Sequence, residues 1–181
     1  MDAPPRDVWV HPVVVVGDSP IAGRGLFATE VLPVDTTVIR LGGRLVSSAK
    51  LDELLGATRV DPGAPYVDTI TVEEDRHLVL PTATMVHFGN HSCDPVLWLT
   101  GPYVIAARRT ISTGEELTLD YGTVSGAPGF RMRCRCGRAA CRGEVSGDDW
   151  RRPELQARAP RQRPALPDPA GHDDLGTSHV R

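Results

Sequence analysis

Four cysteines are the residues of this sequence whose type and spacing most directly suggest chemistry. Cys134, Cys136 and Cys141 lie close together in a C-x-C-x4-C arrangement, and Gly137 follows the second of them. Two thiolates in C-x-C spacing can face one metal ion if the backbone turns tightly around them, and glycine permits such a turn. In an intracellular chain, cysteines clustered in this way are more typical of metal binding than of disulfides.

The remaining cysteine, Cys93, lies well upstream of this trio. A structural zinc site takes four ligands in a tetrahedral arrangement and is closed to water. We therefore predict one structural zinc ion held by Cys93, Cys134, Cys136 and Cys141. Two alternatives stay open: Cys93 can be a buried free thiol that packs as a small apolar residue, and Cys134 can pair with Cys136 in a disulfide, although cysteines so close rarely reach the required geometry.

Four sequence strings surround these cysteines in a specific order. They are Gly23-Arg24-Gly25-Leu26-Phe27-Ala28, Asn90-His91-Ser92-Cys93-Asp94-Pro95, Gly114-Glu115-Glu116-Leu117-Thr118-Leu119-Asp120-Tyr121, and the segment from Cys134 to Gly143. Each string alone is weak evidence. Together and in this order, the chain resembles SET-domain protein-lysine methyltransferases with a post-SET zinc segment, of a small bacterial type. The similarity spans about Gly17 to Glu144.

The resemblance implies a mainly β fold, the SET-domain fold of small sheets (β-clip like), with little helix. In that fold the Asn90–Cys93 segment and the strand that ends in Asp120-Tyr121 cross as a pseudoknot. The domains expected are a flexible lead-in at 1–7, a SET domain at 8–125, a post-SET zinc segment at 126–150, and a disordered tail at 151–181. The tail is rich in proline and poor in large apolar residues, so it cannot offset the entropy of ordering.

The resemblance also implies S-adenosylmethionine as methyl donor and the ε-amine of lysine, in a protein or peptide, as acceptor. Tyr121 is the first catalytic candidate and Tyr66 the second, with core packing as the alternative for each. The residues expected to bind the cofactor are Gly23, Arg24, Gly25, Asn90, His91 and Tyr121. Phe88 is expected in the core, and Trp150 either over the pocket or at the surface.

Methyl transfer from a sulfonium to an amine is an in-line displacement, so the enzyme must align the nucleophile, the methyl group and the leaving sulfur. The amine must be neutral, although the pKa of free lysine is about 10.4. A dry channel and the nearby positive sulfonium both lower that pKa. A strong side-chain base is therefore not essential to the reaction.

Three positions depart from the family pattern: Val96, Leu119 and Arg44. They support a second hypothesis, that the protein is a catalytically weak SET-like module that binds lysine-bearing protein partners. A third hypothesis is a zinc-based module that binds nucleic acid through the arginines 131, 133, 135, 138 and 142. We interpret these arginines as a solvated basic face, because no aromatic residues are interleaved to stack on bases.

The elements that must position these residues are mostly short strands. Apolar runs bounded by turn residues predict strands at 13–16, 26–27, 38–39, 66–72, 78–80, 97–99, 103–107 and 117–121. The acidic run Glu73-Glu74-Asp75 suits a hairpin turn. One helix is predicted from Ser47 to Leu55, with Ser48 as its cap and Gly56 as its stop.

Charge and hydropathy exclude other classes of protein. The chain has 20 Lys+Arg against 23 Asp+Glu, a formal net charge of −3, so binding of nucleic acid by bulk charge is not expected. The longest apolar run, Val13–Val16, is far shorter than the roughly 20 residues of a membrane span, and no secretory signal is visible. We expect an intracellular, cytoplasmic or nucleoid-associated protein. Its partner would be a histone-like, nucleoid or ribosomal protein, with no membrane and no direct sequence-specific nucleic-acid contact.

Overall fold

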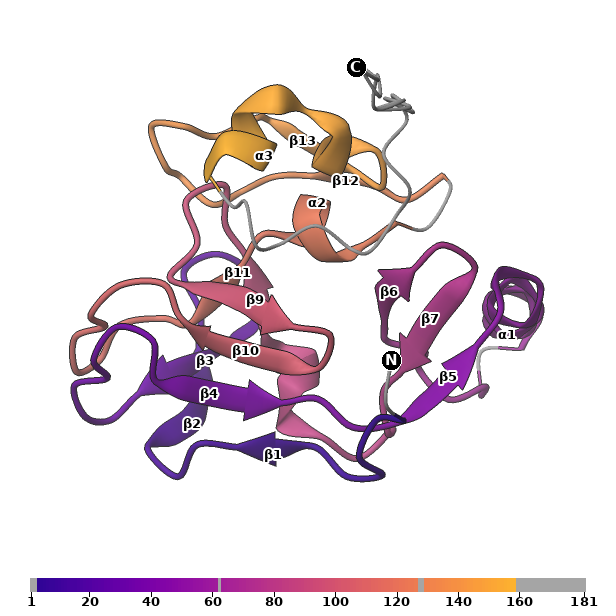
Figure 1. The fold of residues 1–181 in the computed structure, drawn as a ribbon, viewed down its shortest axis with the longest axis horizontal. Coiled ribbons are helices and arrows are strands. Elements are labelled where there is room, and N and C mark those ends of the chain that lie inside the picture. The colour runs from indigo at the N-terminus through magenta and orange to yellow at the C-terminus, as the bar shows by residue number, and fades with distance from the viewer. Residues whose placement is uncertain (1–2, 62, 127–128, 159–181) are drawn as a thin grey trace, which may run out of the picture.

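The computed structural model describes residues 3–61, 63–126 and 129–158, and most of its elements are short strands (Figure 1). The strands are β1 (Trp9–Val10), β2 (Val14–Asp18), β3 (Arg24–Ala28), β4 (Thr37–Arg40), β5 (Arg44–Val46), β6 (Thr69–Glu73), β7 (Arg76–Val79), β8 (Asn90–His91), β9 (Leu97–Gly101), β10 (Val104–Ala107), β11 (Thr118–Leu119), β12 (Arg131–Arg133) and β13 (Glu144–Ser146). The helices are α1 (Ser48–Val60), α2 (Tyr121–Val124) and α3 (Pro153–Arg158), with 3-10 turns η1 (Met85–Phe88) and η2 (Asp149–Arg151). The prediction of a mainly β fold with little helix is confirmed.

The strands form several small sheets rather than one large one. The largest has the order β1-β4-β10-β9, and a second has the order β5-β7-β6, with α1 beside it (Figure 1). Strands β2 and β3 form an antiparallel pair, as do β12 and β13 in the C-terminal segment. Strands β8 and β11 form a two-stranded parallel pair. Small sheets expose many edges, so the loops between them must carry much of the packing.

One apolar core joins these sheets except the β12–β13 pair, which packs in a second cluster with the cysteines. Leu26, Leu41, Leu78, Ile105 and Leu117 are each no more than 2% exposed, and they come from different strands and connections. Alternation along β2 shows how a short strand contributes, since Val14 is buried whereas its neighbour Val15 is 43% exposed. The core therefore fixes the relative positions of segments that are far apart in the sequence.

Helix α1 differs from the helix predicted over Ser47–Leu55. Ser47, not Ser48, is the N-cap, and its side chain accepts a hydrogen bond from the Lys50 backbone nitrogen. The helix also runs through Gly56, where an added Cβ would meet nothing within 4 Å. A single glycine costs a helix only about 1 kcal/mol. The helix ends at Val60 instead. Asp61 is its C-cap and has extended backbone, because the residue before a proline in the sequence avoids helical backbone.

The predicted hairpin is present, but two of the predicted strands are shorter than expected. Strands β6 and β7 pair across a turn in which Asp75 has φ 56°. Strand β6 begins only at Thr69, so Tyr66 precedes the strand rather than opening it. Tyr121 begins helix α2 instead of ending a strand, because the Asp120 side chain caps the helix by accepting from the Gly122 backbone nitrogen at 2.9 Å.

Among the described residues, parts of the expected lead-in and of the expected tail are ordered. Near the N-terminus, the Pro5 carbonyl accepts a hydrogen bond of 2.8 Å from the Gly43 backbone nitrogen, so this part of the expected flexible lead-in is docked. Helix α3 occupies the start of the expected tail and buries Leu155, which is 5% exposed. The rest of the tail, 159–181, lies outside the described residues.

Candidate active site and metal centre

The parallel pairing of β8 with β11 brings the two most specific strings of the sequence together. Thr118 is paired with Asn90 and Leu119 with His91. The Ser92 backbone nitrogen continues the contact by donating to the Leu119 carbonyl at 3.1 Å. As a result, the chain leaving β11 delivers Tyr121 beside the residues of the Asn90–Cys93 segment.

Tyr121 is held at both its backbone and its hydroxyl. Its backbone nitrogen donates to His91 Nδ1 at 3.1 Å, and its hydroxyl donates to the Gly89 carbonyl oxygen. Burial, assisted by the negative charge of Asp68, raises the pKa of Tyr121 far above its usual value of 10.0. The side chain is therefore a protonated, oriented phenol at neutral pH.

The His91 side chain lies between Tyr121 and the cysteine cluster. Because Nδ1 accepts from the Tyr121 backbone, the ring proton is on Nε2, which lies 3.4 Å from Cys93 Sγ. Burial lowers the pKa of His91, although Asp120 opposes the shift, and only 3% of the residue is exposed. The imidazole thus links the backbone of Tyr121 to Cys93 of the cysteine cluster. The predicted contact of the His91 main chain with the cofactor stays a prediction.

Asn90 fastens the Gly23–Gly25 segment to the site. Its side-chain nitrogen donates to Ser19 Oγ at 3.0 Å, to the Arg24 carbonyl at 3.0 Å and to Glu116 Oε1 at 2.8 Å. A Cβ at Gly25 would lie 2.3 Å from Glu116 Oε1, so a larger residue there would displace this carboxylate. The structure therefore brings together the predicted cofactor residues. Ser19 and Glu116 also belong to this constellation, and of these only Glu116 lay within a recognised string.

Tyr121 lines a cavity of about 380 Å³. Tyr66 and Tyr121 both line it, together with Asp68, His87 and Phe130. Tyr66 is 68% exposed, and its ring meets the His87 ring edge-on with centroids 5.5 Å apart. The sequence did not single out Phe130, which follows a stretch without a distinctive motif.

Two other aromatic residues lie elsewhere. Phe88 packs against the apolar core, as predicted, with the Arg24 guanidinium 4.8 Å from its ring centroid. Trp150 lies on η2, where the Arg151 guanidinium is 4.9 Å from its ring centroid. Neither is among the described residues that line the cavity. Trp150 does not close over that cavity.

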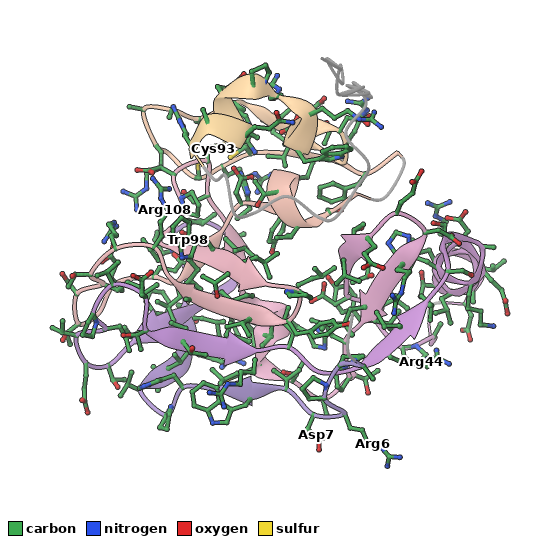
Figure 2. All side chains as sticks on the ribbon, in the orientation of Figure 1. Arg6, Asp7, Arg44, Cys93, Trp98 and Arg108 are labelled. Carbon is green, nitrogen blue, oxygen red and sulfur yellow. The ribbon has the colours of Figure 1, made fainter. Side chains whose placement is uncertain are left out.

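The four cysteine sulfur atoms lie within 4.8 Å of one another, and Cys93 joins the other three across the fold. In Figure 2, Cys93 lies where the loop after β8 meets the C-terminal segment. Its Sγ is 3.6 Å from Cys134 Sγ, too far for a disulfide. None of the four cysteines forms a disulfide, so Cys134 and Cys136 are not paired. Tetrahedral zinc with bonds of about 2.3 Å places its sulfur atoms about 3.8 Å apart, so the cluster fits zinc.

Backbone N–H groups lie close to two of these sulfur atoms. Gly137 has φ 65°, the left-handed conformation that turns the chain between Cys136 and Cys141. The Arg142 backbone nitrogen lies 3.3 Å from Cys93 Sγ, and the Gly143 nitrogen lies 3.4 Å from Cys141 Sγ. Such N–H groups stabilise the negative charge of a metal-bound sulfur.

Arg142 is buried, which contradicts its interpretation as part of a solvated basic face. Its side chain is 8% exposed and makes bonds of 2.8 and 2.6 Å to the two oxygens of Asp120. It also bonds Asp149 at 3.0 Å. Burial opposes the charge, but hydrogen bonding to Asp120 raises the pKa of Arg142 above its usual value. Arg131, Arg133, Arg135 and Arg138 are exposed, as predicted.

Comparison with known proteins decides the family. The model of the SET domain matches residues 23–122, more than half of the chain. The chain belongs to the SET-domain family. Histone-lysine N-methyltransferase SUV39H2 of Gallus gallus is 26% identical over 151 residues, covering 68% of this chain. Histone H3-lysine(4) N-trimethyltransferase ATX1 of Arabidopsis thaliana is 33% identical over 141 residues, covering 72% of this chain.

The SET-domain chain spans only part of these relatives, 37% of the Gallus gallus protein and 13% of the Arabidopsis thaliana protein. The methyltransferase domain of human histone-lysine N-methyltransferase SETMAR has a similar fold, with TM-score 0.56 and 20% identity. That match covers 75% of this chain and 57% of the SETMAR chain. Among the described residues, no helix has both the length and the apolar character needed to cross a membrane.

The three departures from the family pattern take up different positions in this SET domain. Val96 is fully buried in the core, where it packs with apolar neighbours. Leu119 lines the cavity beside Tyr121. Arg44 lies exposed on β5 (Figure 2). Of the three, only Leu119 can act directly on a ligand in the cavity.

Proposed function

We propose that this SET domain transfers the methyl group of S-adenosylmethionine to the ε-amine of a lysine in a protein substrate. The position of the Tyr121 phenol carries the proposal, because its hydroxyl is held by the carbonyl of Gly89, the residue before Asn90, and its side chain lines the cavity together with Tyr66. The relatives named histone-lysine methyltransferases support lysine as the acceptor.

The residues around Asn90 fit the amino-acid end of such a donor. The Asn90 side-chain nitrogen is engaged by protein acceptors, which leaves its oxygen to accept from the donor's ammonium. Space is open beside Gly23, where a Cβ would meet nothing within 4 Å. When bound, the donor supplies a methyl group activated by a sulfonium.

The chain's own residues would then orient the acceptor. Tyr121 keeps its proton and is held by Gly89 and His91, so it offers a fixed polar contact beside the reacting amine. The largely apolar cavity excludes water and lowers the pKa of an entering amine from about 10.4. Alignment of this kind can supply several kcal/mol of the barrier.

The cysteine cluster would hold one structural zinc ion and so fasten the C-terminal segment to Cys93. Phe130 in that segment lines the cavity, which means that metal binding would help to shape the substrate side. A histone-like, nucleoid or ribosomal protein stays our prediction for the substrate. Such proteins expose many lysines.

Labelled S-adenosylmethionine and a panel of core histones, nucleoid proteins and ribosomal proteins test the proposal. We expect label on lysine, located by mass spectrometry. Binding of the donor without any labelling would favour the alternative, a catalytically weak module that binds lysine-bearing partners. Absence of donor binding in protein that contains zinc would contradict both.

A further inference from the structure

The cavity contains an acidic group that the proposed methyl transfer does not use. Among the described residues that line it, Asp68 is the only carboxylate. Its side chain is 29% exposed, and it shares the cavity wall with Tyr66, Tyr121 and His87. Arg59 on α1 is the other charged side chain in the lining. A carboxylate in a mostly apolar cavity costs desolvation free energy, so its position there calls for a function.

His87 fixes the orientation of this carboxylate. Its Nε2 lies 2.9 Å from the Pro81 carbonyl oxygen, which can only accept, so Nε2 carries a hydrogen. Its Nδ1 lies 2.9 Å from Asp68 Oδ2. Both ring nitrogens therefore face acceptors, so only the doubly protonated ring donates to both, and one of these acceptors is an oxygen of Asp68. Within the described residues, the other oxygen, Oδ1, has no hydrogen-bond partner.

The charge of Asp68 acts at the place where the amine would react. Asp68 and Tyr121 line the same cavity, and the negative charge of Asp68 adds to burial in raising the pKa of Tyr121. Apolar walls weaken dielectric screening, so a cation that enters the cavity is attracted more strongly than at the surface.

We propose that Asp68 is a cation subsite that receives the protonated ε-amine of the substrate lysine, and that His87 is the positioning residue that holds Asp68. The inference rests on the proposed function for the identity of the ligand. Asp68 Oδ1 would accept an N–H hydrogen bond from the ammonium as it enters, before the amine loses its proton and reacts beside Tyr121. Each added methyl replaces one N–H donor, so the subsite holds the unmethylated amine most tightly.

The test uses n-butylammonium, a mimic of the lysine side chain, and its neutral counterpart n-butanol at constant ionic strength. Binding is followed through the backbone amide NMR signals of Gly89 and Tyr121 in the zinc-loaded full chain. We expect the wild type to bind the ammonium more tightly than the alcohol. Asp68→Asn should weaken ammonium binding about 10-fold and leave alcohol binding within about 2-fold. Asp148→Asn, which changes an exposed aspartate on the C-terminal segment, should alter neither.

Two His87 variants separate positioning from packing. His87→Asn keeps a nitrogen donor near the place of Nδ1 and should retain part of the preference for the cation, whereas His87→Leu should lose it. A wild type without that preference, or an Asp68→Asn variant that keeps it, would overturn the proposal. The binding measurement needs no turnover. Absence of methyl transfer would therefore count against the proposed function alone.

Discussion

Arg142 and Asp120 form a buried, two-bond ion pair that joins the C-terminal segment to the start of α2 at Tyr121. The same arginine bonds Asp149, and its backbone nitrogen contacts Cys93 Sγ. Asp120 in turn caps the helix that Tyr121 begins. One residue of the C-terminal segment therefore supports both the cysteine cluster and the catalytic candidate.

Replacing Arg142 should destabilise the fold and displace Tyr121. Arg142→Ala leaves the buried Asp120 and Asp149 without their partner, so we expect a loss of about 3–5 kcal/mol in the free energy of unfolding. Arg142→Lys keeps the charge but not the two-bond geometry, so its free energy of unfolding should lie between those of Arg142→Ala and the wild type. Urea unfolding measures both. Arg131→Ala, which breaks an exposed pair with Glu144, is the control and should cost under about 1 kcal/mol.

Zinc should hold the C-terminal segment in place. Removal of the metal by a chelator, or Cys93→Ser, should increase amide hydrogen exchange in β12 and β13, because the cluster is the link between Cys93 and these strands. Metal analysis should find one zinc per wild-type chain. If purified protein binds no zinc, or Cys93→Ser exchanges like wild type, the four-thiolate site is wrong.

Gly25→Ala should impair donor binding. The new Cβ would lie 2.3 Å from Glu116 Oε1, which would displace the carboxylate that accepts from Asn90. We expect the dissociation constant of S-adenosylmethionine, measured by calorimetry, to rise about 10-fold or more. Gly101→Ala is the matched control, because its Cβ would meet nothing within 4 Å. Equal affinities of the two variants would show that Glu116 does not support the donor site.

His77 should make stability depend on pH. Its Nε2 lies 2.9 Å from Ser48 Oγ and its Nδ1 lies 3.1 Å from Thr71 Oγ1, away from the cysteine cluster. Burial lowers the pKa of His77 in the folded protein, although Asp75 and Asp52 oppose the shift. The unfolded chain therefore binds more protons than the folded one. The contribution of His77 to folding stability is therefore complete above about pH 6.5. It is lost as the pH falls through the lowered pKa that His77 has in the folded protein.

Urea midpoints measured at about pH 7.5 and about pH 5.5 check this prediction. The wild type should lose more stability on acidification than His77→Asn, which keeps a polar side chain without the titrating ring. Identical pH dependence in the two proteins would show that His77 does not titrate on unfolding.

The cysteine cluster was predictable from sequence because the type and spacing of its residues are themselves the signal. Cys93, Cys134, Cys136 and Cys141 form the cluster that this spacing predicts, while the ion that they bind stays a prediction. The strands also followed from short apolar runs, since alternation along a strand such as β2 reflects burial of one face.

The roles of Arg142, His91 and Phe130 could not be read in the same way, because each depends on contacts between distant segments. An arginine among exposed arginines gives no sign that Asp120 and Asp149 will enclose it. The start of α2 at Tyr121 had a local signal, the preceding aspartate, but four residues are too few for a periodic pattern. The prediction that α1 stops at Gly56 is wrong, because a single glycine costs a helix little and α1 continues to Val60.

In the proposed reaction, the Tyr121 hydroxyl aligns the reacting amine with the methyl donor. The most direct test of this role is the single-turnover rate of methyl transfer, followed by mass spectrometry, for Tyr121→Phe beside Tyr103→Phe, which changes a tyrosine packed against the core. We predict a loss of about 100-fold or more for Tyr121→Phe with donor affinity preserved, and little change for Tyr103→Phe. A Tyr121→Phe enzyme that transfers methyl groups at the wild-type rate would show that the Tyr121 hydroxyl does not have this role.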